Sequence, residues 1–231
     1  MAGMSANTTV GNIKSDRGEQ QATSASGRKL RAQGHRTREL IVQEAKQLLL
    51  EGGSLEFTLR TVARRAHVAI SNLQYYFPTR ASLMRAIMEP VVARYQAELD
   101  RPIGDAKGAR DIYFALVDQN LADVRDPEVS AIWFHFASLA VTDPESARLL
   151  DESYESLMRG CARLLRVINP SLSPKDSRLL ARIVAAMVDG LGFQIGAGHG
   201  SEKSILGIEA RVRETISLLI ERFPQMHPGT R

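Results

Sequence analysis

The feature that most limits the possible folds is a pair of short amphipathic segments, residues 58–66 and 69–76, joined by a tight turn. Thr58 is a favourable N-cap for the first segment, and Pro78 ends the second because proline cannot donate a helical hydrogen bond. Small and aliphatic residues occupy the expected crossing point: Val62, Ala63, Ala66, Val68 and Leu73. This pattern is typical of a helix-turn-helix, whose second helix lies in the DNA major groove.

The outward-facing side chains of these two segments suit DNA recognition. Amides and hydroxyls hydrogen-bond base edges and an aliphatic group can touch a thymine methyl, so we expect base contacts from Ile70, Ser71, Asn72 and Gln74. Phosphate contacts, which set register, are expected from Thr58, Arg60, Arg64, Tyr75, Tyr76 and Arg80. The alternative interpretation is an ordinary helical hairpin with solvated arginines.

Charge is distributed unevenly along the chain. Residues 1–80 contain 12 Lys and Arg against 6 Asp and Glu, whereas residues 81–231 contain 18 against 20. A basic front on a near-neutral body indicates a polyanionic partner for the front alone. The basic run at residues 28–31 is a candidate minor-groove arm. A solvated, disordered tail is the favoured interpretation of residues 1–35, because they offer too little apolar surface to build a core.

The remainder of the chain is predicted to be all-α, with no convincing strand pattern. A capping residue followed by proline, at 126–127, 143–144 and 173–174, marks three helix starts, and Gly52 and Gly53 supply a stop for the first helix. The apolar i+4 series from Leu83 to Leu99 contains Pro90, which predicts one kinked helix. About nine helices are expected, near residues 36–51, 58–66, 69–76, 79–100, 105–125, 127–141, 144–168, 174–195 and 202–222.

Residues 36–88 resemble the DNA-binding domain of TetR-family repressors. The residues that carry the resemblance are Thr58, Val62-Ala63, Ala66-His67-Val68-Ala69, Leu73-Gln74-Tyr75-Tyr76-Phe77, Pro78-Thr79-Arg80 and Leu83. Three positions depart from the family pattern. His67 replaces a turn glycine, which predicts strain if φ is positive there. Ala69 replaces the serine that caps the recognition helix, at a cost of about 1 kcal/mol, and Gln74 replaces a tyrosine, which predicts an altered base preference at one position.

The resemblance also implies an architecture. Residues 36–80 would form the DNA-binding domain, and residues 81–231 a body that binds an effector and dimerises. The last two helices would pair with their symmetry mates in a four-helix bundle through Val184, Met187, Val188, Leu191, Ile208, Val212, Ile216 and Leu219. A two-fold homodimer would present two recognition helices about one DNA turn apart, hence a palindromic operator on double-stranded DNA.

An effector pocket is expected in the body, between the fifth and eighth helices, chiefly because of the resemblance. Ligand pockets are mostly apolar with a few convergent polar groups. The candidates are Tyr113, Phe114, Trp133, Phe136, Tyr154, Met158, Phe193 and Gln194, with His135 as a further polar group. The alternative is that these side chains belong to the core, which is the usual role of aromatics at helical spacing.

The sequence offers little evidence for enzymatic activity, cofactor binding or membrane insertion. G-x-S-x-G, P-loop and H-E-x-x-H motifs are absent, and Cys161 is the single cysteine, expected to be a small buried hydrophobe. No secretory signal or membrane span is visible, so we expect a cytoplasmic protein without cofactor or metal. The sequence predicts a DNA-binding repressor modulated by a small, largely apolar effector. Two alternatives are a DNA-bound protein-interaction module without a small ligand, and a helical enzyme.

Overall fold

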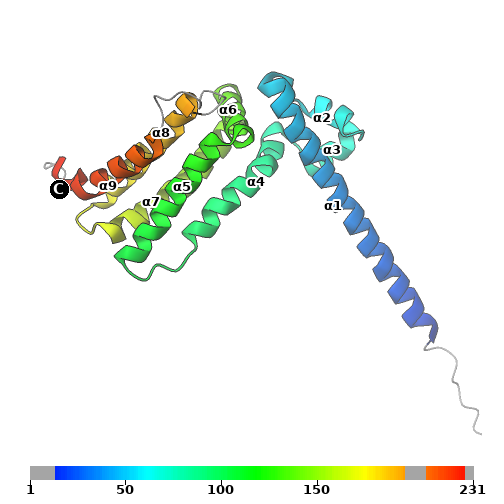
Figure 1. Cartoon of the computed structure of the whole chain (residues 1–231). Coiled ribbons are helices and arrows are strands. Elements are labelled where there is room, and N and C mark those ends of the chain that lie inside the picture. Colours follow the sequence, from blue (N-terminus) through cyan, green and yellow to red (C-terminus); the bar gives the residue numbers. More distant parts are fainter. Residues whose placement is uncertain (1–13, 196–206, 227–231) are drawn as a thin grey trace, which may run out of the picture.

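The computed structural model describes the backbone of residues 14–195 and 207–226, with side chains for 31–195 and 207–223. Within those ranges it contains nine helices and no strand, which confirms the all-α prediction (Figure 1). The helices are α1 (Lys14–Glu56), α2 (Leu59–Arg65), α3 (Ile70–Tyr76), α4 (Arg80–Leu99), α5 (Ala106–Arg125), α6 (Pro127–Thr142), α7 (Pro144–Ile168), α8 (Pro174–Ile195) and α9 (Ile208–Met226). Helices α2 to α8 lie within one residue of their predicted bounds.

The first helix is longer than the sequence predicted. It begins at Lys14, whereas a disordered tail was expected before residue 36, and its N-terminal half extends away from the rest of the molecule (Figure 1). Alanine, glutamine, glutamate and arginine are good helix formers, so local propensity can continue the helix. Residues 1–13 lie outside the described part of the chain. The stop predicted at Gly52 and Gly53 corresponds to a break inside α1: Gly53 has a φ of 68°, a value that glycine adopts without steric cost, and helical residues continue to Glu56.

Helices α2 and α3 form the predicted helix-turn-helix against α1. Thr58 caps α2, because its Oγ1 accepts a hydrogen bond from the Thr61 N–H at 3.1 Å. His67 lies in the turn with φ of 52°, and Ala69 precedes α3 without a side-chain cap. Both structural consequences of the departures noted in the sequence are therefore confirmed. Leu73 is fully buried and fixes α3 with its opposite face exposed.

The body is built from α4 to α9 around α7, which packs against α4, α5, α6 and α8. Capping aspartates start α6 and α7 as predicted; Asp126 Oδ1, for example, accepts the N–H of Glu128 at 2.9 Å and of Val129 at 3.0 Å. Helix α4 is a single helix that contains Pro90. The final helix starts at Ile208, later than predicted, and residues 196–206 lie outside the described ranges. Among the helices that are described, none is long and apolar enough to cross a membrane.

Two joints connect the head (residues 36–80) to the body (residues 81–231). At the first, the end of α1 lies on α6, where the Ser54 and Ser138 hydroxyls are 3.2 Å apart. At the second, the start of α4 lies on α7, and Thr79 Oγ1 donates to Glu145 Oε1 at 2.9 Å. Ion pairs at the two joints are Lys46–Glu128, Arg80–Asp143 and Arg85–Glu152. Since α4 runs from the head into the body, a shift of α4 moves both.

Candidate functional site

The outer face of α3 carries the side chains expected to contact bases. Ile70, Ser71, Asn72 and Gln74 are all exposed, and none of these four belongs to the buried core. Leu73, between them in sequence, points inward and is fully buried. Residues three or four positions apart share a face of a helix, so Ser71 and Gln74 lie on one face of α3. The burial of Leu73 leaves that polar face open to a DNA groove.

The residues expected to contact phosphates are placed less uniformly. Arg60 is exposed, and Tyr75 is 80% exposed at the end of α3. The Tyr76 ring is half-buried, with its hydroxyl so close to Gly34 of α1 that a Cβ there would lie 3.3 Å away. Arg80 also has a partner in the body, because its Nη2 lies 3.7 Å from Asp143 Oδ1. Arg80 therefore faces the second joint, while Thr58 remains exposed and caps α2.

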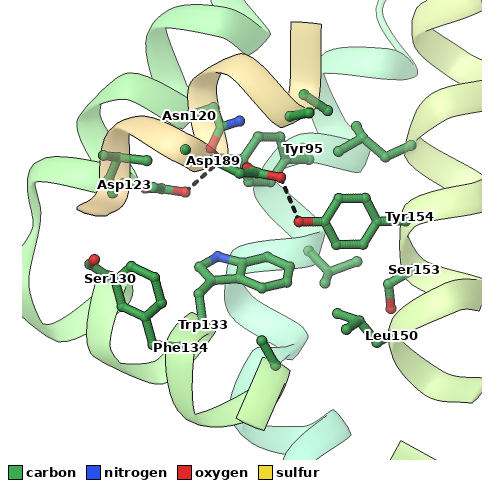
Figure 2. Close-up of a pocket in the computed structure, with 18 of the residues that line it drawn as sticks. Tyr95, Asn120, Asp123, Ser130, Trp133, Phe134, Leu150, Ser153, Tyr154 and Asp189 are labelled. Carbon is green, nitrogen blue, oxygen red and sulfur yellow. Dashed lines mark hydrogen bonds between the residues drawn. The ribbon is translucent and has the colours of Figure 1, made fainter. Parts of the chain in front are cut away.

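A cavity of about 400 Å³ lies in the body and is lined by residues of α4, α5, α6, α7 and α8 (Figure 2). Its wall is mainly aromatic and aliphatic. The Trp133 ring lies edge-on to Tyr154, with centroids 6.1 Å apart, and Phe134 contacts Phe193, with centroids 4.7 Å apart. Polar groups enter this wall from Tyr95, Asn120, Asp123, Ser130, Ser153, Tyr154 and Asp189.

Two carboxylates enter the cavity wall, and their partners differ. Asp123 is paired with a cation: Arg94 Nη2 lies 2.7 Å from its Oδ1, and the Tyr95 hydroxyl donates to its Oδ2 at 2.9 Å. Asp189 accepts a hydrogen bond from the Tyr154 hydroxyl at 2.7 Å (Figure 2) and another from Asn120. The described groups that contact Asp189 are therefore neutral donors.

This difference shapes the electrostatics of the cavity. Burial raises the pKa of Asp189, and the hydrogen bonds from Tyr154 and Asn120 only partly oppose that rise. A buried carboxylate without a cationic partner carries a desolvation cost that a bound cation would relieve. Trp133, Tyr154 and Phe193 also line the cavity, and the face of an aromatic ring attracts cations through its π system. The cavity is thus suited chemically to a small organic cation with an apolar surface.

The effector candidates from the sequence divide into two groups. Trp133, Tyr154 and Phe193 line the cavity. Five others do not: Tyr113, Phe114, Phe136 and Met158 are buried in the core, and Gln194 is exposed outside the lining. Phe136 supports the wall from behind, because its ring stacks on Trp133 with centroids 6.2 Å apart. The half-buried His135 is also outside the lining, and its imidazole faces Gly53 at the first joint.

The dimer residues expected from the sequence mostly face inward. Val184, Val188, Leu191, Val212 and Ile216 are buried within the protomer, and Met187, Ile208 and Leu219 are partly buried. The widest apolar stripe of each helix is the one the protomer uses for its own core. The large apolar residues left exposed on α8 lie on another face, at Leu179, Ile183 and Phe193.

Sequence reasoning named Tyr154 among the polar groups of the cavity but missed its two carboxylates, Asp123 and Asp189. A signal was present for Asp123, since it follows Leu116 by two helical turns on the buried face of α5. Carboxylates on such faces are seldom buried unless they are partnered. That exception marks them as candidates for a polar site.

Family models match both parts of the chain. Residues 41–87 match the model described as bacterial regulatory proteins of the tetR family, and residues 109–222 match the model for the C-terminal part of BetI-type transcriptional repressors. The chain belongs to the TetR family of transcriptional regulators. The match places the helix-turn-helix of this TetR-family regulator in the DNA-binding domain of the family, and places α5 to α9 in the family's C-terminal domain.

Individual relatives agree with this assignment. The transcriptional regulator BetI of Stenotrophomonas maltophilia is 29% identical over 172 residues, covering 72% of this chain and 86% of BetI. Among solved structures, Salmonella enterica GusR has a TM-score of 0.63 at 17% identity, covering 80% of this chain and 95% of GusR. A Saccharomonospora viridis regulator solved in complex with choline has a TM-score of 0.58 at 21% identity, covering 81% of this chain and 96% of that regulator. The two solved structures share the fold with this TetR-family regulator.

Proposed function

We propose that this TetR-family regulator is a repressor that binds a palindromic operator as a homodimer and is released by a small organic cation. The head, residues 36–80, binds DNA, and residues 81–231 hold the effector and the dimer contacts. Base contacts come from Ile70, Ser71, Asn72 and Gln74, while Thr58, Arg60, Tyr75 and Tyr76 bind phosphates. Arg80 also takes part in the joint to the body.

The observation that carries the effector class is Asp189. It is a largely buried carboxylate whose contacts are neutral hydroxyl and amide donors, and it lies in a cavity walled by aromatic rings. A cation placed against Asp189 and the Trp133 face would satisfy both features, since aromatic cages recognise quaternary ammonium groups. The choline bound to the Saccharomonospora viridis regulator is a ligand of this chemical class. The sequence predicted a largely apolar effector. The aromatic wall supports an effector that carries an apolar surface beside its charge.

Coupling between effector and DNA runs through α4. Its Arg94 and Tyr95 hold Asp123 in the cavity wall, and its first turn contacts α7 through Thr79. An effector that changes the fit between α4 and α5 shifts α4, and α4 carries the head with it. A ligand can shift such an equilibrium only by its difference in affinity between the two states. Pro90, which lies between these two contact regions, is where α4 is most easily bent.

The test is binding of the purified protein to its own upstream intergenic DNA, measured by fluorescence anisotropy at several salt concentrations. Selective binding with a steep salt slope is expected, together with release by choline chloride and no release by sodium chloride at equal ionic strength. Sequence-indifferent binding would overturn the repressor assignment. Selective binding that no organic cation weakens would overturn the effector class alone.

A further inference from the structure

A second cavity, of about 480 Å³, lies where the end of α4 meets α7 and the start of α8. Four arginines and one carboxylate line it, and none of the described residues in this lining is aromatic. We call this cavity the basic pocket. Its formal charge is an excess of three positive charges. The charged residues are Arg159, Arg163 and Arg166 of α7, Arg178 of α8, and Asp100 directly after α4.

The basic pocket lies far from the DNA-binding head. Helix α7 begins at the second joint, where Glu145 contacts Thr79, and Arg163 follows Glu145 by 18 residues. At a rise of 1.5 Å per residue this is about 27 Å along the helix. Figure 1 likewise shows the end of α4 and the start of α8 at the end of the body away from α2 and α3. The arginines of the pocket are therefore not part of the surface expected to bind DNA phosphates.

The fold concentrates positive charge at this pocket. Arg159, Arg163 and Arg166 are four and three residues apart, so they share a face of α7. Like charges at this spacing destabilise a helix. Arg178 adds a fourth guanidinium from α8, which packs against α7. Such an arrangement calls for negative charge nearby to offset the repulsion.

Side chains of the protein supply little of that negative charge to the first two arginines. Arg159 Nη1 lies 4.0 Å from Glu155 Oε2, but Glu155 is also paired with Arg182 of α8. Arg163 Nη2 donates at 2.9 Å to the main-chain carbonyl of Leu99, which is a neutral acceptor.

The other two arginines are available to a ligand. Arg166 and Arg178 are exposed, and neither forms an ion pair or a hydrogen bond with another residue in the described ranges. Asp100, the one carboxylate of the lining, accepts a hydrogen bond from Gln96 Nε2 at 2.7 Å. It opposes an anion, but the excess of positive charge remains.

The chemistry of the lining defines the class of ligand. Guanidinium groups bind the oxygens of phosphates and carboxylates through paired N–H donors, whereas a nucleobase is usually held by stacking on an aromatic side chain. We propose that the basic pocket binds a compact oxyanion with at least two negative charges, a phosphate monoester or a di- or tricarboxylate, as a second ligand of the body. This site is separate from the cavity that contains Asp189. On α8 the lining of that cavity begins at Ala185, and the lining of the basic pocket ends at Arg178.

Occupancy has a consequence for stability. Leu99 packs so closely on α7 that a Cβ at Gly160 would lie 2.6 Å from its Cδ1. An anion held by Arg163 and Arg178 bridges α7 and α8 beside this contact with α4. The unfolded chain does not preserve the pocket, and a ligand that binds only the folded state stabilises it. The anion should therefore raise the midpoint of thermal unfolding.

The test is isothermal titration calorimetry of the full chain with pyrophosphate and with citrate, at constant ionic strength set by sodium chloride and without divalent metals. We expect saturable binding of one anion per protomer. The double variant Arg166→Gln and Arg178→Gln should lose at least about ten-fold in affinity, because it removes two charge-assisted donors. The matched control is Lys107→Gln with Arg148→Gln, which changes the net charge equally at two exposed positions outside the lining. Its affinity should stay within about two-fold of the wild type, because general screening is equal in both variants.

Thermal unfolding without ligand checks that the double variant is intact. Its midpoint should equal or exceed that of the wild type, because two like charges have been removed, and only the wild type and the control should gain stability from millimolar anion. Binding of pyrophosphate alone would assign the phosphate class, binding of citrate alone the carboxylate class, and binding of both a site that selects charge and size. Absence of saturable binding, or equal affinities in the double variant and the control, would overturn the site. Neither choline nor operator enters these measurements, so their outcome is independent of the proposed function.

Discussion

The sharpest test of the cavity chemistry is Asp189→Asn, which removes one negative charge while keeping the shape and a hydrogen-bond acceptor for Tyr154. Two unit charges about 5 Å apart attract by about 3 kcal/mol at an effective dielectric constant of about 20. Part of this is offset because burial raises the pKa of Asp189, so a proton competes with the cation. We therefore expect a loss of about 2–3 kcal/mol, or about 30- to 150-fold in affinity for choline.

The assay is a titration followed by Trp133 fluorescence, with choline and its neutral carbon isostere 3,3-dimethyl-1-butanol as paired ligands. The substitution should lower the affinity for choline by the stated factor. The affinity for the isostere should stay the same or rise slightly, because a neutral ligand gains nothing from the carboxylate. Asp111→Asn is the matched control; Asp111 is an exposed residue of α5 outside the lining, and its substitution should affect neither ligand. Equal losses for both ligands in Asp189→Asn would refute the electrostatic argument and indicate damage to packing.

The same carboxylate, Asp189, should make both choline affinity and protein stability depend on pH. Since the pKa of Asp189 is raised in the folded protein, its proton-bound form persists above the ordinary range for aspartate. A cation favours the ionised form, so choline affinity should rise as pH increases through that raised pKa and then level off. Conversely, the contribution of Asp189 to the stability of the ligand-free protein is present at low pH and is lost as pH rises through the same range. The rise in affinity should be absent from Asp189→Asn.

Three further predictions concern the head and the core. Arg60→Ala should weaken binding to all DNA sequences alike and lower the salt slope by about one for each half-site, or about two for the dimer. Asn72→Ala should cost about 1–3 kcal/mol for each half-site and relax selectivity at one base pair of each half-site. Anisotropy with single-base operator variants distinguishes the two. Ala69→Ser should raise the free energy of unfolding by about 0.5–1 kcal/mol, because it supplies the side-chain cap that α3 lacks; an unchanged urea midpoint would show that the cap does not form. Burial raises the pKa of the Cys161 thiol to about 12. At pH 8 the native protein should therefore react with a disulfide reagent far more slowly than the urea-unfolded chain. Comparable rates would contradict the buried placement of Cys161.

The success of the sequence in predicting the fold has a local cause. Helix starts at Asp126 and Asp143 depend on capping groups and prolines within three residues, and Gly53 breaks the regular path of α1 through its own backbone freedom. The strain at His67 could likewise be predicted from the sequence, because a tight turn needs a positive φ there. Such signals require no knowledge of distant residues, so the boundaries of α2 to α8 were accurate. The start of α1 was predicted wrongly for a related reason, since helical propensity without an apolar stripe is a weak signal.

The cavity and the protomer surface were harder to predict, because both depend on how helices turn relative to one another. Phe136 and Met158 have the same chemical character as Phe193, and only packing decides which of them face the cavity. Val188 and Ile183 are both aliphatic residues of α8, yet the first is buried in the protomer and the second is exposed. Hydrophobic periodicity identifies a stripe but not the neighbour that covers it. A carboxylate on a buried face, as at Asp123, is more informative because burial requires a partner.

The second joint offers a way to separate binding from coupling. Glu145 and Glu152 of α7 contact Thr79 and Arg85 of α4, at 2.9 Å and 3.3 Å, and neither glutamate lines the cavity or belongs to the head. Exposed pairs of this kind contribute about 0–1 kcal/mol each. The double variant Glu145→Gln and Glu152→Gln should therefore preserve operator binding without effector and choline binding without DNA to within about five-fold, while changing the factor by which each ligand weakens the other.

Thermodynamic linkage between the two binding sites adds a quantitative requirement to this prediction. The factor by which choline weakens operator binding must equal the factor by which operator DNA weakens choline binding, in the wild type and in the variant alike. Anisotropy of labelled operator gives the first factor, and Trp133 titration with and without operator gives the second. If the two factors change together, the contacts between α4 and α7 belong to the coupling. An unchanged factor would leave the joint between α1 and α6, where Ser54 meets Ser138, as the route by which the body acts on the head.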